Sequence, residues 1–146
     1  MLTPSLFNGM PYAGEATVIP LKMHLYIQAL AFVQGMTLRA VHEDCATRFL
    51  AEKAWEKGLR WRDGRPPAVS GPEWVEVHVR IPAHLADNLA EVSRRNGVGL
   101  PDALYTMLYW YAWVLYPPLQ EQERRKTKFR ASKAREERER CHRSLP

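Results

Sequence analysis

The sequence predicts a mainly α-helical protein with a two-stranded antiparallel β-ribbon, built from two copies of one strand–helix–helix unit. A charged C-terminal extension follows the second copy. Two observations predict this fold class. Each copy shows an apolar period of two, typical of a half-buried strand, and then two stretches of helical period separated by a glycine turn. The copies lie within residues 15–57 and 74–116, and corresponding positions in them are 62 apart without a gap.

The first copy has the weaker strand. In this strand one face carries Thr17, Ile19 and Leu21, and the other carries Val18, Pro20 and Lys22. Pro20 cannot donate a ladder hydrogen bond, so we expect this strand to be short or bulged. A short helix is expected over residues 24–34. The segment that begins at Gly35 breaks this helix, and a longer helix is expected over residues 38–57.

The second copy has the clearer pattern. Valine and isoleucine residues alternate with polar residues over 75–81, which predicts a strand with one buried face. Pro82 ends this strand and suits the first turn of a helix, which we expect to stop at residues 97–99. A last helix, apolar on more than one side, is expected over residues 100–116.

The shift of 62 positions aligns both the breaks and the apolar positions of the two copies. It takes Pro20 to Pro82 and Gly35 to Gly97. The aligned apolar pairs are Ile19 and Ile81, Ile27 and Leu89, Leu30 and Val92, Leu38 and Leu100, Val41 and Ala103, Cys45 and Met107, and Phe49 and Tyr111. Identity between the copies is low, so the repeat is one of pattern.

Three segments outside the copies complete the predicted organisation. Residues 1–14 contain prolines and glycines without periodicity, which predicts a loose N-terminal arm. Residues 58–73 have the glycine and proline content of a linker. Two prolines open the tail, residues 117–146, which is expected to be an exposed helix or disordered. The tail holds ten of the 21 basic and five of the 16 acidic residues, so the net charge of +5 lies within it.

A unit of this size cannot satisfy its single strand or bury its core alone, whereas two copies can pair their strands over four helices. The order strand, helix, glycine turn, helix resembles the ribbon-helix-helix superfamily of the Arc and MetJ repressors, best over residues 74–108. Tandem copies in one chain resemble the TraY-type accessory proteins of conjugative plasmids. The resemblance implies a pseudo-dimer within one chain that binds double-stranded DNA.

In that family the ribbon enters the major groove and its outward side chains read base edges. Carried over to this chain, the resemblance implies base contacts from Glu76, His78 and Arg80 of the second strand. Arg80 suits guanine and Glu76 suits cytosine. The outward residues of the first strand are Ala16, Val18, Pro20 and Lys22, of which only Lys22 suits a base contact. Polar residues at these positions are also typical of any strand face that is exposed to solvent, whether or not it binds DNA.

The resemblance also implies that the amides at the start of each second helix bind a DNA phosphate. The residues expected there are Thr37, Arg39 and Gly99, although Pro101 and Asp102 weaken the second of these sites. The basic tail is expected to follow the phosphate backbone. Its candidate contacts are Arg124, Arg125, Lys126, Lys128 and Arg130.

The helix over residues 100–116 carries a second aromatic stripe that the core does not explain. The stripe comprises Tyr105, Tyr109, Trp113 and Tyr116. The linker, the tail or another protein must cover it, and exposed aromatic patches usually mark interfaces. We therefore expect a protein contact here, through self-association along DNA or with subunits of a larger nucleoprotein complex such as a relaxase.

Several classes of function are not expected. The five histidines and two isolated cysteines lack the spacing of a metal site or disulfide framework, and neither a phosphate-binding glycine loop nor a nucleophile motif is present. We therefore expect no enzyme activity and no cofactor. No charge-free apolar run is long enough to span a membrane, and a cytoplasmic location is expected.

The leading functional hypothesis is a sequence-specific DNA-binding accessory protein of a mobile element, acting in a relaxosome or conjugation system. A transcriptional repressor, including one of its own operon, is the first alternative. The second is a protein-interaction subunit whose ribbon-helix-helix fold has lost DNA reading, which the poor first strand and the neutral body favour.

Overall fold

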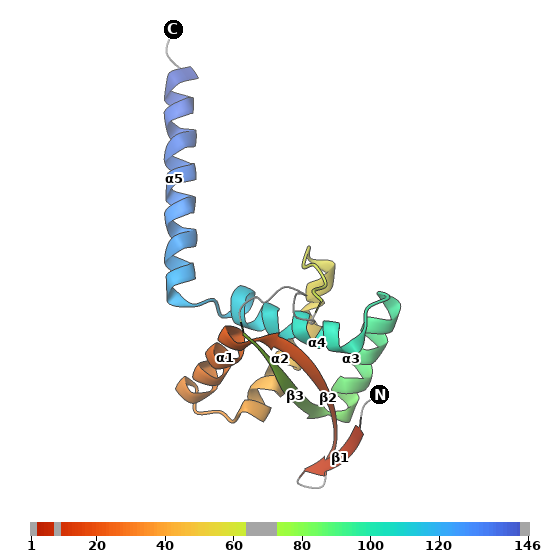
Figure 1. Ribbon diagram of the computed structural model, residues 1–146. Coiled ribbons are helices and arrows are strands. Elements are labelled where there is room, and N and C mark those ends of the chain that lie inside the picture. Colours follow the sequence, from red (N-terminus) through yellow and green to blue (C-terminus); the bar gives the residue numbers. More distant parts are fainter. Residues whose placement is uncertain (1–2, 8–9, 64–72, 144–146) are drawn as a thin grey trace. The chain divides into compact units, whose positions relative to one another are not determined.

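The computed structural model describes residues 3–7, 10–63 and 73–143, which form two compact units, residues 1–115 and 116–146 (Figure 1). The first unit contains a three-stranded antiparallel sheet and four main helices, and the second contains one long helix. The elements in chain order are β1 (Thr3–Phe7), β2 (Met10–Pro20), α1 (Leu21–Val33), α2 (Leu38–Glu52), the 3-10 helix η1 (Ala54–Glu56), β3 (Trp74–Pro82), α3 (Ala83–Arg95), α4 (Leu100–Tyr109), the π-helical segment η2 (Trp110–Leu115) and α5 (Leu119–Arg143).

Strands β2 and β3 pair antiparallel along nine residues each, from Tyr12 opposite Pro82 to Pro20 opposite Trp74. This is the ribbon that the sequence predicts, and it runs across the helices in Figure 1. Its central pair joins Ala16 to His78, which are themselves 62 positions apart. Pro20 is the last residue of β2, where its missing amide interrupts nothing. The expectation of a short or bulged first strand is therefore wrong.

The N-terminal segment is also different from the prediction. Residues 3–7 form β1, which pairs with residues 10–14 of β2, so the described part of this segment is a hairpin and not a loose arm. β1 lies at the edge of the sheet, where Pro4 is tolerated because one side of the strand needs no hydrogen bonds. β1 is only five residues long and contains Pro4, so the sequence gives it no clear alternation. The sheet is consequently three-stranded at this end.

The helices of the two copies have related bounds. α1 begins directly after Pro20 and α3 directly after Pro82, since a proline fixes the backbone angle that suits a helix start. Each then ends at a glycine in the left-handed conformation, Gly35 with φ +66° and Gly97 with φ +65°. The same backbone bond closes both turns: Met36 N–H donates to Ala31 O and Val98 N–H to Ser93 O, each at 2.9 Å.

The core lies between the ribbon and the helices, and the two copies interlock in it. α2 packs against β3, and α4 packs against β2. Thr17 of β2 donates its hydroxyl hydrogen to the Pro101 carbonyl at the start of α4 (2.7 Å), and the Cys45 thiol of α2 donates to the Met107 carbonyl (3.4 Å). Residues 15–57 and 74–116 therefore contribute to one shared core.

The later segments refine the predicted bounds. α2 stops at Glu52 and η1 follows, so the expected helix to residue 57 is too long. The described linker residues 58–63 belong to no helix or strand, and the linker residues 64–72 lie outside the described part. Trp61 packs against Phe49 with ring centres 6.2 Å apart.

The tail forms the helix α5, which is one of the two states expected for it. No helix in the described part of the chain is long and apolar enough to cross a membrane.

Candidate nucleic-acid interface

Glu76, His78 and Arg80 lie on the outer face of β3. They are exposed, and they alternate with the buried residues Val77 and Val79. His78 Nε2 lies 3.2 Å from Glu76 Oε1, while the two side chains remain 69% and 61% exposed. The alternation thus presents a polar row to solvent and an apolar row to the helices, as the period of two requires.

The facing row on β2 is small and apolar. Gly14 lies opposite Arg80, Ala16 opposite His78 and Val18 opposite Glu76. A Cβ atom at Gly14 would lie 3.3 Å from Arg80 Cγ, so the Arg80 side chain crosses over Gly14. Among Gly14, Ala16, Val18 and the three β3 residues opposite them, the polar side chains of this outer face are therefore those of β3. Sequence reasoning missed Gly14, because only the strand register shows that it makes room for Arg80.

Lys22 does not belong to this face. It lies in the first turn of α1 and is exposed. Its assignment as an outward strand residue is wrong because the helix starts directly after Pro20, three residues earlier than the sequence suggested. The shift of 62 positions places His84, in the first turn of α3, at the corresponding point.

The two expected helix starts are present. Thr37 is the N-cap of α2, and its Oγ1 accepts a hydrogen bond from the Ala40 amide (3.1 Å). Gly99 is the N-cap of α4, with Pro101 and Asp102 in the first turn as the sequence indicates. Arg39 lies over the Tyr12 ring, with its guanidinium carbon 5.5 Å from the ring centre. The start of α2 therefore carries a cation, and the start of α4 carries an anion.

The basic side chains of α5 form a separate set in the second unit. Arg124, Lys126, Lys128 and Arg130 are exposed, and the side chain of Arg125 lies outside the described part. Lys126 Nζ lies 3.8 Å from Glu123 Oε1, one helical turn away. Exposed pairs of this kind contribute little to stability. The cations therefore remain accessible to a polyanion.

The second aromatic stripe is largely covered by the chain itself. Tyr105 is buried and packs edge-on against Trp74, with ring centres 5.9 Å apart. The guanidinium carbon of Arg62 in the linker lies 3.8 Å from the centre of the Tyr109 ring. Trp113 stacks on Tyr26 of α1. The predicted protein interface is therefore wrong for Tyr105, and for Tyr109 and Trp113 one ring face is already covered.

The stack is close to parallel, with ring centres 5.6 Å apart and an angle of 5° between the planes. Tyr116 is half-buried and belongs to the second unit. The sequence could have suggested the cover from α1, because Tyr26 is an aromatic residue in a largely aliphatic helix. It could not have shown which stripe Tyr26 meets, since that depends on how the helices pack.

Buried ionisable groups occur away from the ribbon. His42 of α2 is 2% exposed, and its Nε2 has no hydrogen-bond partner among the described residues. Burial, with a smaller contribution from the charge of His24, lowers the pKa of His42 to about 4. Within the described ranges, no group of three His, Cys, Asp or Glu side chains is arranged to hold a metal ion.

No protein-family model matches the chain, and no curated protein or solved structure gives a match to it.

Proposed function

We propose that this protein binds double-stranded DNA sequence-specifically, with the β2–β3 ribbon in the major groove. The observation that carries the proposal is the outer face of the ribbon, where three exposed polar side chains, Glu76, His78 and Arg80, project from one strand. A two-stranded ribbon fits the major groove, which is about 12 Å wide. Arg80 would donate two hydrogen bonds to guanine, and Glu76 would accept from cytosine.

We also propose that the chain is a tandem ribbon-helix-helix pseudo-dimer, which the spacing of its elements supports. The pair Ala16–His78 joins equivalent positions of the two copies, so the strand pairing is symmetric about it. The bounds of α1 and α3 differ by 62 at both ends, and the starts of α2 and α4 differ by the same number. A single chain with this symmetry presents its ribbon to DNA as a dimer of one-unit chains would.

The symmetry of the backbone is not matched by the side chains. On the outer face β2 offers Gly14, Ala16 and Val18, which suit contact with thymine methyl groups at most. β1 pairs with β2 only as far as Gly14, so the ribbon is two-stranded from Glu15 to Pro20. Base reading would therefore come mostly from the polar row of β3, and the DNA site would be asymmetric, not a palindrome.

Phosphate contacts would position the ribbon. The start of α2, with Thr37 and Arg39, provides helix amides and a cation, whereas Asp102 opposes a phosphate at the start of α4. The exposed cations of α5 would add contacts that depend on salt but not on sequence. Affinity would come mostly from these groups and specificity from β3.

We further propose that the DNA-binding protein serves a mobile element as an accessory factor that recruits other proteins, including a relaxase. A specific observation supports recruitment. Leu25, Phe32 and Val33 of α1 are 52%, 87% and 80% exposed, where the shift of 62 positions gives the charged residues Asp87, Arg94 and Arg95 on α3. The same apolar face also favours the second candidate, an interaction subunit without DNA reading. A transcriptional repressor is the alternative with the same DNA chemistry.

Selection of bound fragments from genomic DNA, followed by footprinting, tests the proposal. We expect a discrete footprint, placed at a transfer origin for an accessory protein and at its own promoter for a repressor. Phe32→Asp should leave the footprint unchanged, and Arg80→Ala should weaken it. The absence of any specific footprint would overturn the DNA proposal in favour of the interaction subunit.

A further inference from the structure

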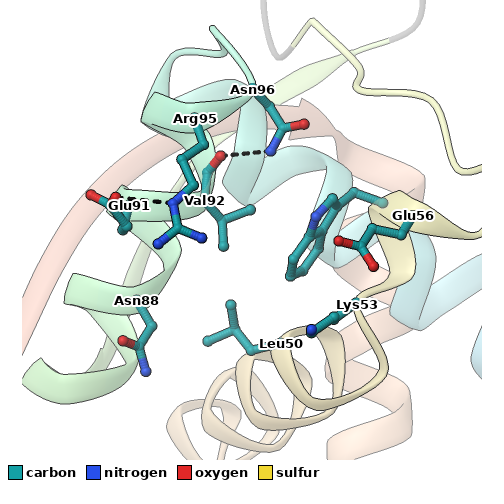
Figure 2. A pocket seen from close by; sticks show the side chains of 9 residues that line it. Leu50, Lys53, Glu56, Asn88, Glu91, Val92, Arg95 and Asn96 are labelled. Atoms are coloured by element: carbon teal, nitrogen blue, oxygen red, sulfur yellow. Dashed lines mark hydrogen bonds and ion pairs between the residues drawn. The ribbon is translucent and has the colours of Figure 1, made fainter.

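An open pocket of about 460 Å³ lies between the C-terminal end of α2 and the neighbouring side of α3 (Figure 2). Leu50, Val92 and the indole of Trp55 supply its apolar lining, and charged and amide side chains supply the rest. A volume of this size falls in the range of small-molecule sites. Three of the nine lining residues are apolar and six are charged or amide side chains, so the lining is more polar than that of most such sites.

The other half of the molecule shows how this space can be closed. The shift of 62 positions takes Tyr26 of α1 to Asn88 of α3, which lines the pocket. Tyr26 fills the space beside α1 by stacking on Trp113 of η2. Asn88 is much smaller and has no ring to stack. The chain therefore fills one of two corresponding spaces and leaves the other open.

Lys53 is a second, independent feature of the pocket. It has φ +49°, the left-handed conformation, and it is the one such non-glycine residue in the described ranges. α1 and α3 end at glycines, for which this conformation carries no steric penalty, whereas a residue with a Cβ atom loses roughly 1 kcal/mol. Backbone outliers of this kind cluster at ligand sites. The side chain of Lys53 lines the pocket.

The charged residues at the rim of the pocket indicate the charge of the ligand. Glu91 receives hydrogen bonds from Arg94 Nε (3.1 Å) and Nη2 (2.6 Å), a two-pronged contact that neutralises it, and one more from Arg95 Nε (3.0 Å). The two positive charges of Arg94 and Arg95 therefore exceed the single negative charge of Glu91 by one. Lys53 and Arg95 together outnumber Glu56, the remaining acidic residue of the lining. An anionic group is favoured at this rim.

We propose that this pocket binds a small molecule with a planar aromatic ring and one anionic group, a carboxylate or a phosphate. The ring lies against Trp55, Leu50 and Val92, and the anion lies between Arg95 and Lys53. The ligand bridges α2 and α3, and α3 follows β3 without a break. This inference stands apart from the DNA proposal, because it concerns a different face and a different ligand.

Titration of the full isotope-labelled chain by nuclear magnetic resonance tests the proposal. The probes are indoleacetate and adenosine monophosphate, each compared with a neutral analogue, indoleacetamide or adenosine. We expect shifts of the Trp55 indole N–H and of the Lys53 and Asn96 amides. The favoured anion should bind roughly tenfold more tightly than its neutral analogue. Phenylacetate and phenyl phosphate, which share one ring, are compared as well, and the tighter of these two distinguishes a carboxylate ligand from a phosphate ligand.

Three variants make the test specific. Asn88→Tyr should abolish binding by copying the closed half, whereas Asn88→Ala should retain it. Arg95→Gln, in a side chain that is 70% exposed, should remove the preference for the anion without changing binding of the neutral analogue. Retained binding by a folded Asn88→Tyr, an unchanged preference in Arg95→Gln, or no shift with any probe at low-millimolar concentration would each overturn the proposal.

Discussion

Arg80 carries most of the proposed sequence reading, and its position depends on the residue across from it. Gly14 has no side chain, so the stem of Arg80 lies over the β2 backbone. A polar residue on the outer face of a strand is common, but the pairing with a glycine is decided by register alone. The two residues therefore act as one unit, Arg80 as the contact and Gly14 as the residue that positions it.

Arg80→Ala should weaken binding to the specific site by about 1–3 kcal/mol, because the variant cannot form a two-pronged bond to guanine. Binding to unrelated DNA should change little. Gel-shift titration at fixed salt measures both. Gly14→Val should give part of the same effect by displacing the Arg80 side chain, and Arg94→Ala on α3 is the matched control. An equal decrease on specific and unrelated DNA would assign Arg80 to phosphate contact.

His42 should make stability depend on pH. Its pKa is lowered to about 4 by burial, and its ordinary value in an unfolded chain is about 6.5. The folded protein therefore binds this proton less tightly than the unfolded chain does. The contribution is fully present above pH 6.5 and is lost as the pH falls from about 6.5 to 4, by about 3 kcal/mol in all.

Urea unfolding at several pH values between 7.5 and 4 checks this expectation. His42→Leu should flatten the decline over that range, and His84→Gln, in an exposed side chain, should not. The free energy of unfolding of the unsubstituted protein is compared with that of His42→Leu at both ends of the pH range. If the unsubstituted protein shows no greater decline than His42→Leu, the expectation of a buried neutral His42 is contradicted.

At the scale of the elements, glycine turns define where the helices end. Gly35 and Gly97 occupy the same turn in the two copies, with φ near +65° in both. Gly97→Ala should lower the free energy of unfolding by about 1 kcal/mol, because a Cβ atom is disfavoured at positive φ even where space is open around it. Asp87→Ala, an exposed change in the same helix, is the control. Thermal or urea unfolding measures the difference.

The helix α5 should set the salt dependence of DNA binding. Replacing Arg124, Lys126, Lys128 and Arg130 by glutamine should reduce the slope of log affinity against log salt by about 0.9 for each DNA phosphate that the helix no longer neutralises. Specificity should be unchanged. Replacing Glu136 and Glu137 by glutamine is the control, because it removes negative charges from the helix where the first variant removes positive ones. An unchanged slope in the basic-to-neutral variant would remove α5 from the DNA interface.

At the scale of the whole molecule, a symmetric backbone carries an asymmetric face. The polar row comes from β3, and the row on β2 is small and apolar. Base changes at the positions that the β3 row reads should therefore cost about 1–3 kcal/mol each, and changes at the positions related to them by the symmetry of the ribbon much less. A systematic set of single-base variants measures this. Equal costs at symmetry-related positions would show that β2 reads bases as well.

Much of the fold was predictable because local patterns define it. The strand over residues 74–82, the turns at Gly35 and Gly97 and the pairing of the two strands follow from periodicity and from the repeat. Strand β1 was missed because it is only five residues long and contains Pro4, and only pairing with β2 reveals it. The same limit applies to the aromatic stripe, whose cover comes from Arg62 and Tyr26, residues distant in the chain.

The sequence by itself determined the order strand, helix, helix that occurs twice along the chain, the polar row Glu76–His78–Arg80 and the segregation of positive charge into the tail. These depend on spacing and composition, which are local properties of a chain. The tertiary structure alone decided that Gly14 faces Arg80, that Tyr26 closes one space while Asn88 leaves its counterpart open, and that Tyr105 is buried. Those outcomes depend on register and on helix packing, in which residues far apart in sequence meet, and no local pattern encodes that meeting.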